Sequence, residues 1–167
     1  MALTKSELIS SLQNEVRILV HLASKIDHHQ LDYRPTAKQR STIELLRYLN
    51  VMGPALVQGT IAGAFDGAAW GVAQQAAEAR TFDQVVASIA TQSEFYASAI
   101  GHMHEADFRT EIEMFGNTTT KGAFLVNMVL CGHAAYRTQL FNYLKACGRE
   151  ELGTANLWRG VDAPPPD

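Results

Sequence analysis

The side chains in this sequence that are best suited to chemistry lie in two short stretches, STIELLRYLN at 41–50 and GHAAYRTQL at 132–140. They are a carboxylate, two phenols, an imidazole and a guanidinium, carried by Glu44, Tyr48, Tyr136, His133 and Arg137. Such groups donate and accept hydrogen bonds, so together they suit a small polar ligand. Helix bundles form their pockets from residues on facing helices. We therefore expect these five side chains to line one pocket between the two stretches.

Three of these residues have a structural as well as a functional interpretation. His133 is either a core histidine held by hydrogen bonds, or a displaced metal ligand or general base. Tyr48 and Tyr136 either fill the core, each with a partner for its hydroxyl, or present donors in a metal-free pocket. The sequence alone leaves both pairs of alternatives open.

The role of Arg137 depends on which face of its helix is buried. The expected core-facing stripe follows helical spacing through Gly132, Tyr136, Leu140 and Tyr143. His133 and Arg137 lie one position around the helix from this stripe. Arg137 then either reads the carboxylate or phosphate of a ligand, or pairs with Glu44 or Glu94 across the bundle, as buried arginines usually do.

Capping boxes, in which a Ser or Thr and a Glu or Gln three residues later cap each other's backbone, mark three helix starts. They are Thr4 with Glu7, Ser41 with Glu44, and Thr81 with Gln84. Together with apolar stripes at helical spacing, they predict four long helices, at 5–27, 41–63, 82–104 and 119–147. Gly53 and Pro54 should kink or split the second of these helices.

The connections between the helices set the expected topology. A long segment with a short helix of its own at 72–79 separates the second long helix from the third, which lets the chain cross over and leaves the two parallel. No run of residues alternates as a strand does, and 106–117 is expected to be an irregular connector. The sequence therefore predicts an all-α, up-down-down-up four-helix bundle over 1–148. The tail at 149–167 should pack partly on the bundle through Leu157 and Trp158.

Composition and charge restrict the classes of protein that fit. With 47% hydrophobic and 19% charged residues among 167, the chain is typical of one globular domain. A net charge of −3 with scattered basic residues lacks the basic patch that DNA or RNA binding needs. We expect no signal peptide and no membrane-spanning stretch. Cys131 and Cys147 lie too far apart on one helix to pair, which favours reduced thiols and a cytoplasmic location.

Two motifs resemble a known family. The frame Ser41-x-x-Glu44-Leu45-Leu46 and, far downstream, Arg137-x-Gln139-Leu140 resemble the DinB/YfiT-like superfamily of small four-helix bundles. Members of that superfamily with an intact site bind a divalent metal through three histidines, one on the second helix and two on the last long helix. The corresponding positions here are Tyr48, Gly132 and Tyr136. The resemblance thus implies the fold and its up-down-down-up order, with the metal ligands replaced.

Two hypotheses for function follow. The first is a bundle without metal or other cofactor that binds a small molecule or serves as a structural dimeric unit. The second, implied by the resemblance, is a divalent-metal-dependent thiol transferase, isomerase or hydrolase. We prefer the first, because a neutral phenol is a poor metal ligand near pH 7 and His133 lies about 100° around the helix from the family's ligand position. Glycines at 59, 63, 67 and 71, with an exposed Trp70, favour a homodimer.

Overall fold

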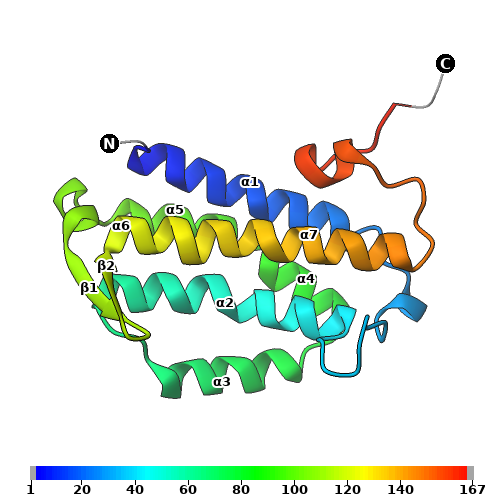
Figure 1. The fold of residues 1–167 in the computed structure, drawn as a ribbon, viewed down its shortest axis with the longest axis horizontal. Coiled ribbons are helices and arrows are strands. Elements are labelled where there is room, and N and C mark those ends of the chain that lie inside the picture. Colours follow the sequence, from blue (N-terminus) through cyan, green and yellow to red (C-terminus); the bar gives the residue numbers. More distant parts are fainter. Residues whose placement is uncertain (1–2, 165–167) are drawn as a thin grey trace.

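The computed structural model describes residues 3–164, and nearly all of its regular structure is helical (Figure 1). The α-helices are α1 (Lys5–Ala23), α2 (Thr42–Ala62), α3 (Gly67–Glu78), α4 (Phe82–Ala90), α5 (Gln92–Gly101), α6 (Lys121–Phe124) and α7 (Cys131–Ala146). The strands are β1 (Glu111–Met114) and β2 (Asn117–Thr120). Short 3₁₀ segments occur at His28–Gln30 and Glu105–Arg109, and π-helical segments at Leu125–Leu130 and Ala155–Arg159.

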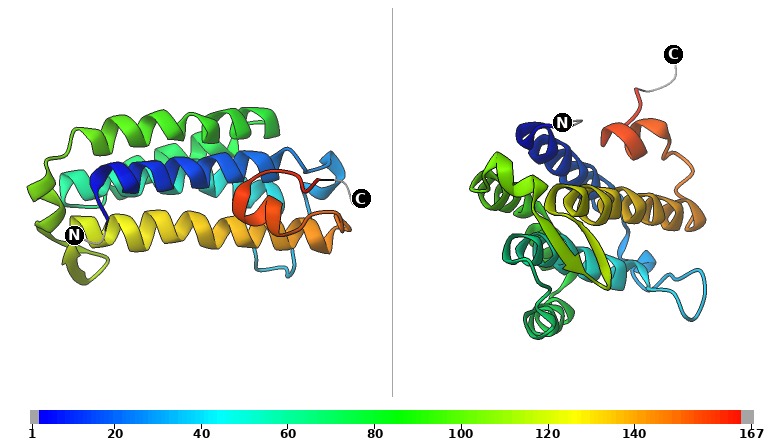
Figure 2. Two further views of the ribbon diagram at one scale, coloured as in Figure 1. Left: turned by 90° about the horizontal axis from the view of Figure 1, so that it is seen from above. Right: turned by 60° about the vertical axis from the view of Figure 1, so that its left-hand side comes forward.

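Four helical units form the bundle, namely α1, α2, α4 with α5, and α6 with α7 (Figures 1 and 2). Both α1 and α2 pack against α5 and α7, so α1 and α2 face each other across the bundle. The chain passes back along the outer side of α2 as α3, which packs mainly against α2. As a result, α2 and the α4–α5 pair run in the same direction. The all-α bundle with a long crossover and up-down-down-up order is confirmed.

The three predicted capping boxes form, which explains why most helix starts were predicted correctly. Several other boundaries differ from the prediction. The first long helix ends at Ala23, and the third is divided at Thr91 into α4 and α5. The last begins as α6 and passes through a π-helical segment before α7. The short crossover helix begins at Gly67 rather than 72, because the Asp66 side chain accepts a hydrogen bond from the Ala69 backbone at 2.9 Å and caps it.

Pro54 lies inside α2 without splitting the helix. Proline has no backbone N–H, so it leaves the Asn50 carbonyl oxygen without its usual helical donor. The side chain of Gln92 on α5 fills this gap. Its Nε2 donates to the Leu49 carbonyl oxygen at 2.9 Å and to the Asn50 carbonyl oxygen at 3.3 Å. A donor from a neighbouring helix thus accompanies a continuous α2, as the predicted helix at 41–63 requires, and of the two expected effects of Gly53 and Pro54 the split does not occur.

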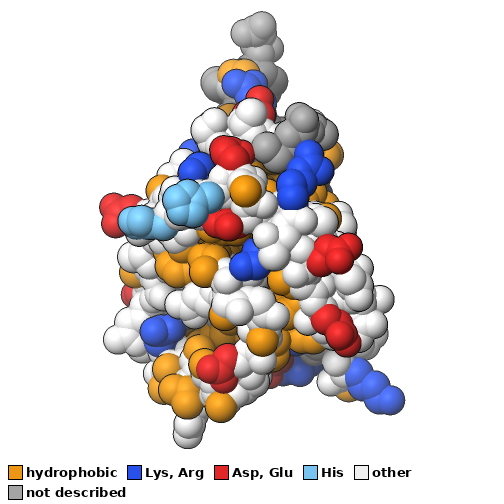
Figure 3. Space-filling model, turned by 90° about the vertical axis from the view of Figure 1, so that its left-hand side faces the viewer, with side chains coloured by type: hydrophobic (Ala, Val, Ile, Leu, Met, Phe, Trp, Pro, Cys, Tyr) orange, Lys and Arg blue, Asp and Glu red, His pale blue; other side chains and the backbone are white. Residues whose placement is uncertain are grey.

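The segment expected to be an irregular connector contains a β-hairpin. Glu111 pairs with Thr120 and Met114 with Asn117 in an antiparallel register. The two residues between the strands, Phe115 and Gly116, both have positive φ angles of 54° and 76°, as tight hairpin turns require. Figure 3 views this end of the molecule, where hydrophobic side chains reach the surface; Phe115 is 55% exposed. Asn-Gly or Asp-Gly would have announced such a turn, but Phe-Gly does not.

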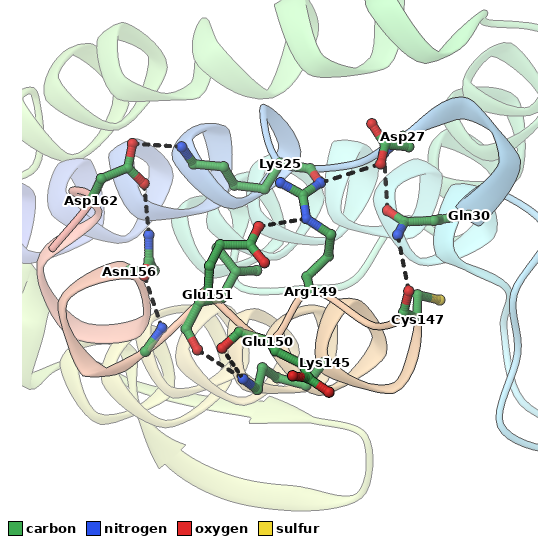
Figure 4. A network of polar contacts seen from close by, with 12 residues as sticks. Lys25, Asp27, Gln30, Lys145, Cys147, Arg149, Glu150, Glu151, Asn156 and Asp162 are labelled. Carbon is green, nitrogen blue, oxygen red and sulfur yellow. Dashed lines mark hydrogen bonds and ion pairs between the residues drawn. The ribbon is translucent and has the colours of Figure 1, made fainter. Parts of the chain in front are cut away.

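The C-terminal segment folds back onto α1 and α7 (Figure 4). Lys25 forms an ion pair with Asp162 at 2.7 Å, and Arg149 contacts Asp27 at 3.6 Å. The buried residues of this segment are Leu152, Asn156 and Gly160. Trp158 is 62% exposed, and its ring centre lies 5.2 Å from the Arg137 guanidinium of α7, so it contacts the bundle from the surface. The end of the expected tail, 165–167, lies outside the described residues.

The glycines at 59, 63, 67 and 71 do not share one helix face. The first lies in α2, the second is its left-handed C-cap with a φ of 81°, and the last two lie in α3. Trp70 is partly buried, with its ring centre 5.9 Å from that of Tyr48 and 5.6 Å from that of Phe65, so its expected exposure is wrong. The large hydrophobic side chain of α3 that is exposed is Val72, with 70% of its surface accessible. Within 3–164, no helix combines the length and the apolar character that crossing a bilayer requires.

Candidate functional site

Aromatic side chains from three helices meet on the α3 side of the bundle. Tyr48 of α2 and Tyr136 of α7 lie edge to face, with ring centres 5.0 Å apart. Trp70 of α3 contacts the same Tyr48 ring, and the Arg40 guanidinium lies 4.0 Å from its centre. Edge-to-face and cation–π contacts of this kind orient the rings as well as attract them. The structure therefore brings the two predicted tyrosines together and adds Trp70 and Arg40 to them.

A cavity of about 440 Å³ opens beside these rings between α2 and α3, and we name it the α2–α3 cavity. It is lined by Arg40, Glu44, Arg47, Tyr48, Val51, Trp70, Gln74 and Glu78. A second cavity of about 360 Å³ continues between the same helices, and the two share Val51 and Trp70. Most of the other residues along the second cavity are small, and they come from α2 as well as from the alanine-rich α3. The peripheral crossover helix thus leaves open space against the bundle.

Glu44 lines the α2–α3 cavity, but its carboxylate is already engaged. One oxygen accepts from the Ser41 backbone N–H at 2.7 Å, and the other accepts from Arg34 at 3.1 Å. These contacts, that of Ser41 first, lower the pKa of Glu44. Glu44 is therefore an ionised capping residue whose charge Arg34 offsets.

Arg47 is the less satisfied cation of the cavity. Its Nη2 donates to the Arg80 carbonyl oxygen at 2.9 Å, near the C-terminal end of α3. Its Nε is shielded from water and has no hydrogen-bond partner among residues 3–164. A buried donor without an acceptor is unfavourable by about 1–3 kcal/mol.

Tyr48 holds its proton firmly. Burial is the main cause that raises the pKa of this phenol to about 12, and the adjacent Tyr136 hydroxyl raises it further than the nearby Arg40 lowers it. A phenol with so high a pKa stays protonated near pH 7. Tyr48 is therefore a neutral hydrogen-bonding group and an aromatic wall.

His133 faces away from this cavity, into the core between α2 and α5. Its Nε2 lies 2.6 Å from the Tyr96 hydroxyl, which lies 3.1 Å from Oε1 of Gln92. Burial lowers the pKa of His133 to about 4, so the imidazole is neutral at pH 7. A Cβ on Gly53 would lie 1.8 Å from the Tyr96 hydroxyl, so glycine is needed for this close approach. His133 thus belongs to a core hydrogen-bond chain with Tyr96 and Gln92, which the sequence analysis did not identify.

Arg137 also faces away from the cavity. Its Nη1 lies 3.2 Å from Oε1 of Glu15 on α1, and both side chains are buried. The expected pairing with Glu44 or Glu94 is therefore wrong. The reason is the orientation of α7, whose fully buried residues are His133, Arg137, Leu140, Tyr143 and Leu144, whereas Gly132 and Tyr136 lie at the margin. Of the five candidate residues, Glu44 and Tyr48 line the α2–α3 cavity, and Tyr136 contacts Tyr48 without lining it. The expectation of one shared pocket is therefore wrong for Tyr136, His133 and Arg137.

The positions that carry histidine ligands in metal-binding DinB/YfiT-like proteins do not suit a metal here. Tyr48 and Tyr136 are in contact and offer two phenol oxygens. The third position is Gly132, which has no donor side chain, and a Cβ there would already lie 3.3 Å from the Met52 side chain. Elsewhere in 3–164, no three side chains of His, Cys, Asp or Glu gather as a metal ion would require. The donor set therefore does not fit a divalent metal.

Comparisons with known proteins place the fold. No family model and no curated protein matches the sequence. A DinB-like protein from Bacillus subtilis is 19% identical over 87% of this chain and 94% of its own, with a TM-score of 0.67. A protein assigned to the DinB family, from Exiguobacterium sibiricum, is 24% identical over 91% of this chain and 98% of its own, with a TM-score of 0.68. The chain therefore has the DinB-like fold, as its sequence motifs predicted.

Proposed function

We propose that this protein is a DinB-like bundle that binds a small molecule in the α2–α3 cavity without a divalent metal. The observation that carries the proposal is the cavity itself, which has aromatic walls at Tyr48 and Trp70 and is also lined by Arg47. Its volume of about 440 Å³ is within the range of small-molecule pockets, and its lining combines the aromatic and aliphatic walls of Tyr48, Trp70 and Val51 with charged and amide side chains that can fix a polar ligand.

Binding is favoured over catalysis by the proton affinities around the cavity. A general acid or base works best with a pKa near the working pH. The pKa of Tyr48 is raised to about 12, and that of Glu44 is lowered by its hydrogen bonds. Both shifts move away from neutrality, so neither group exchanges a proton readily at pH 7.

We also propose that the protein is a cytoplasmic homodimer without nucleic-acid or membrane partners. The support for a dimer is the outer face of α3, which is uncharged from Gly67 to Ala77 and carries the exposed Val72. The support for a reducing compartment is that Cys131 and Cys147 are both free. The alternative function, metal-dependent transfer, isomerisation or hydrolysis, is tested by the chelator experiment in the Discussion.

A fragment screen with a blocked cavity tests the proposed function. Gln74 is exposed and lines the cavity, so Gln74→Trp should fill it without disturbing the core. Gln75→Trp is the matched control, because Gln75 is an exposed glutamine on the same helix that lines neither cavity. Aromatic fragments of acidic, basic and neutral character are screened by ligand-detected NMR. We expect hits that bind the wild type and Gln75→Trp but not Gln74→Trp. Equal binding to all three proteins, or no binding to any, would contradict the proposal.

A further inference from the structure

We infer that the ligand of the α2–α3 cavity is a flat, apolar molecule that carries a carboxylate. This inference rests on the proposed function and adds the chemical class of the ligand. It depends on the charges at the cavity and on the shape of its walls.

The first step concerns the donors of Arg47. The only hydrogen bond that its guanidinium makes within residues 3–164 is the one from Nη2 to the Arg80 carbonyl oxygen, and no carboxylate there forms an ion pair with it. A guanidinium presents its N–H groups as a planar fork that matches the two oxygens of a carboxylate. A carboxylate in the cavity would give Arg47 the acceptors that the chain does not provide.

The second step concerns the balance of charge at the cavity. Arg40 adds another cation, held by the Tyr48 ring and without an ion-pair partner in the described chain. Two carboxylates also line the cavity. Glu44 is offset by Arg34, whereas Glu78 is exposed to water on α3, where its charge is well screened. Arg40 and Glu78 are both exposed and opposite in charge, which leaves the partly buried Arg47 as the unbalanced charge and favours a negative ligand.

The third step concerns the apolar part of the ligand. Tyr48 and Trp70 present aromatic rings to the cavity, and Val51 adds an aliphatic wall. The Tyr48 and Trp70 rings meet edge to face at an interplanar angle of 66°, so their surfaces form two sides of a corner. A flat hydrocarbon placed in this corner contacts both rings while its carboxylate lies toward the arginines. An aromatic carboxylate of two fused rings meets these requirements.

Isothermal titration calorimetry with 2-naphthoate and its uncharged isostere 2-naphthamide tests the inference. The wild type should bind 2-naphthoate about tenfold more tightly than 2-naphthamide, because a charge-assisted bond to a guanidinium is the main difference between the probes. Arg47→Met should remove most of this preference. Arg159→Met is the matched control: it removes one exposed arginine from the C-terminal segment and should leave the preference for 2-naphthoate unchanged. Glu78→Gln should leave the preference nearly unchanged, because water screens the charge of Glu78.

Two further results keep the test decisive. Arg40 is exposed, so Arg40→Met should fold normally and should reduce the preference even if Arg47→Met is too unstable to assay. Equal affinity of the wild type for both probes would overturn the inference but leave the proposed function standing. If neither probe binds, the inference is overturned. The fragment screen with Gln74→Trp then decides separately whether the cavity binds small molecules at all.

Discussion

The Gly53→Ala substitution tests how tightly α2 and α5 pack in this bundle. A methyl group on Gly53 would lie 1.8 Å from the Tyr96 hydroxyl and 2.8 Å from Nε2 of His133, closer than any packed atoms can be. Either the helices separate or Tyr96 moves, and both responses disrupt the hydrogen bonds that join Gln92, Tyr96 and His133.

The expected magnitude follows from three contributions. Overpacking of a core costs about 1–3 kcal/mol, and the buried polar groups left without partners cost about 1–3 kcal/mol. Alanine returns about 1 kcal/mol through its higher helix propensity. Gly53→Ala should therefore lower the free energy of unfolding by about 3 kcal/mol, a change of this order moving the melting temperature by roughly 10 °C in a chain of this size. Urea unfolding followed by circular dichroism measures the first, and calorimetry the second.

Gly71→Ala is the matched control. Gly71 also lies within a helix, but a Cβ there meets no atom within 4 Å, so the variant should be more stable than the wild type by about 1 kcal/mol. The double variant Gly53→Ala/Tyr96→Phe should be less unstable than the sum of its single variants, because the nearest clashing atom is gone. Equal stability of Gly53→Ala and Gly71→Ala, or full additivity with Tyr96→Phe, would refute this account of the core.

Four more predictions follow. Glu15→Gln or Arg137→Met should destabilise the fold by about 3–5 kcal/mol in urea unfolding, because each leaves one charge of a buried pair uncompensated; an effect below 1 kcal/mol would show that the pair is solvated. The pKa of His133 is lowered to about 4 in the folded protein, so as the pH falls below about 6.5 this imidazole becomes protonated in the unfolded chain before it does in the folded one. Proton binding then favours unfolding, and the wild type should lose stability between pH 6.5 and 4 more steeply than His133→Gln. Burial raises the pKa of Glu15 despite Arg137, so protonation of Glu15 favours the folded state as the pH falls, equally in the wild type and in His133→Gln. A steeper loss of stability in His133→Gln than in the wild type would contradict the prediction. The melting temperature should be the same with and without a strong chelator, and a metal-dependent increase abolished by His133→Ala would reveal a metal site. Sedimentation at micromolar concentration should give a dimer that Val72→Glu converts to monomer, and a monomeric wild type would exclude the proposed dimer.

The fold was predictable because its main signals are local. Thr4, Ser41 and Thr81 each form a capping box within four residues, and the apolar stripes that follow need no knowledge of distant parts of the chain. The hairpin was missed because its turn uses Phe115, which sequence preferences do not associate with a positive φ. The sequence left open whether Gly53 and Pro54 would split α2, because the donor near Pro54 comes from Gln92 on another helix.

The candidate site was only partly predictable because it depends on how helices face one another. Tyr48 and Tyr136 were paired correctly by their helical positions. Arg137 was assigned to the wrong partner, because its partner Glu15 lies on α1, and the spacing within α7 does not show which helix each side chain faces. The cavity itself depends on the path of α3, and nothing within the sequence around Trp70 indicates that this helix covers Tyr48.

The most direct measurement of the central claim is a chemical-shift map of isotope-labelled protein titrated with a fragment from the screen. The account predicts that the largest changes occur at the indole N–H of Trp70 and at the backbone amides of residues that line the α2–α3 cavity, with Val51 and Gln74 among them. The same titration of Gln74→Trp should leave those signals unmoved. Changes centred on another surface, or unaltered by the blocking substitution, would contradict the claim that this cavity is the ligand site.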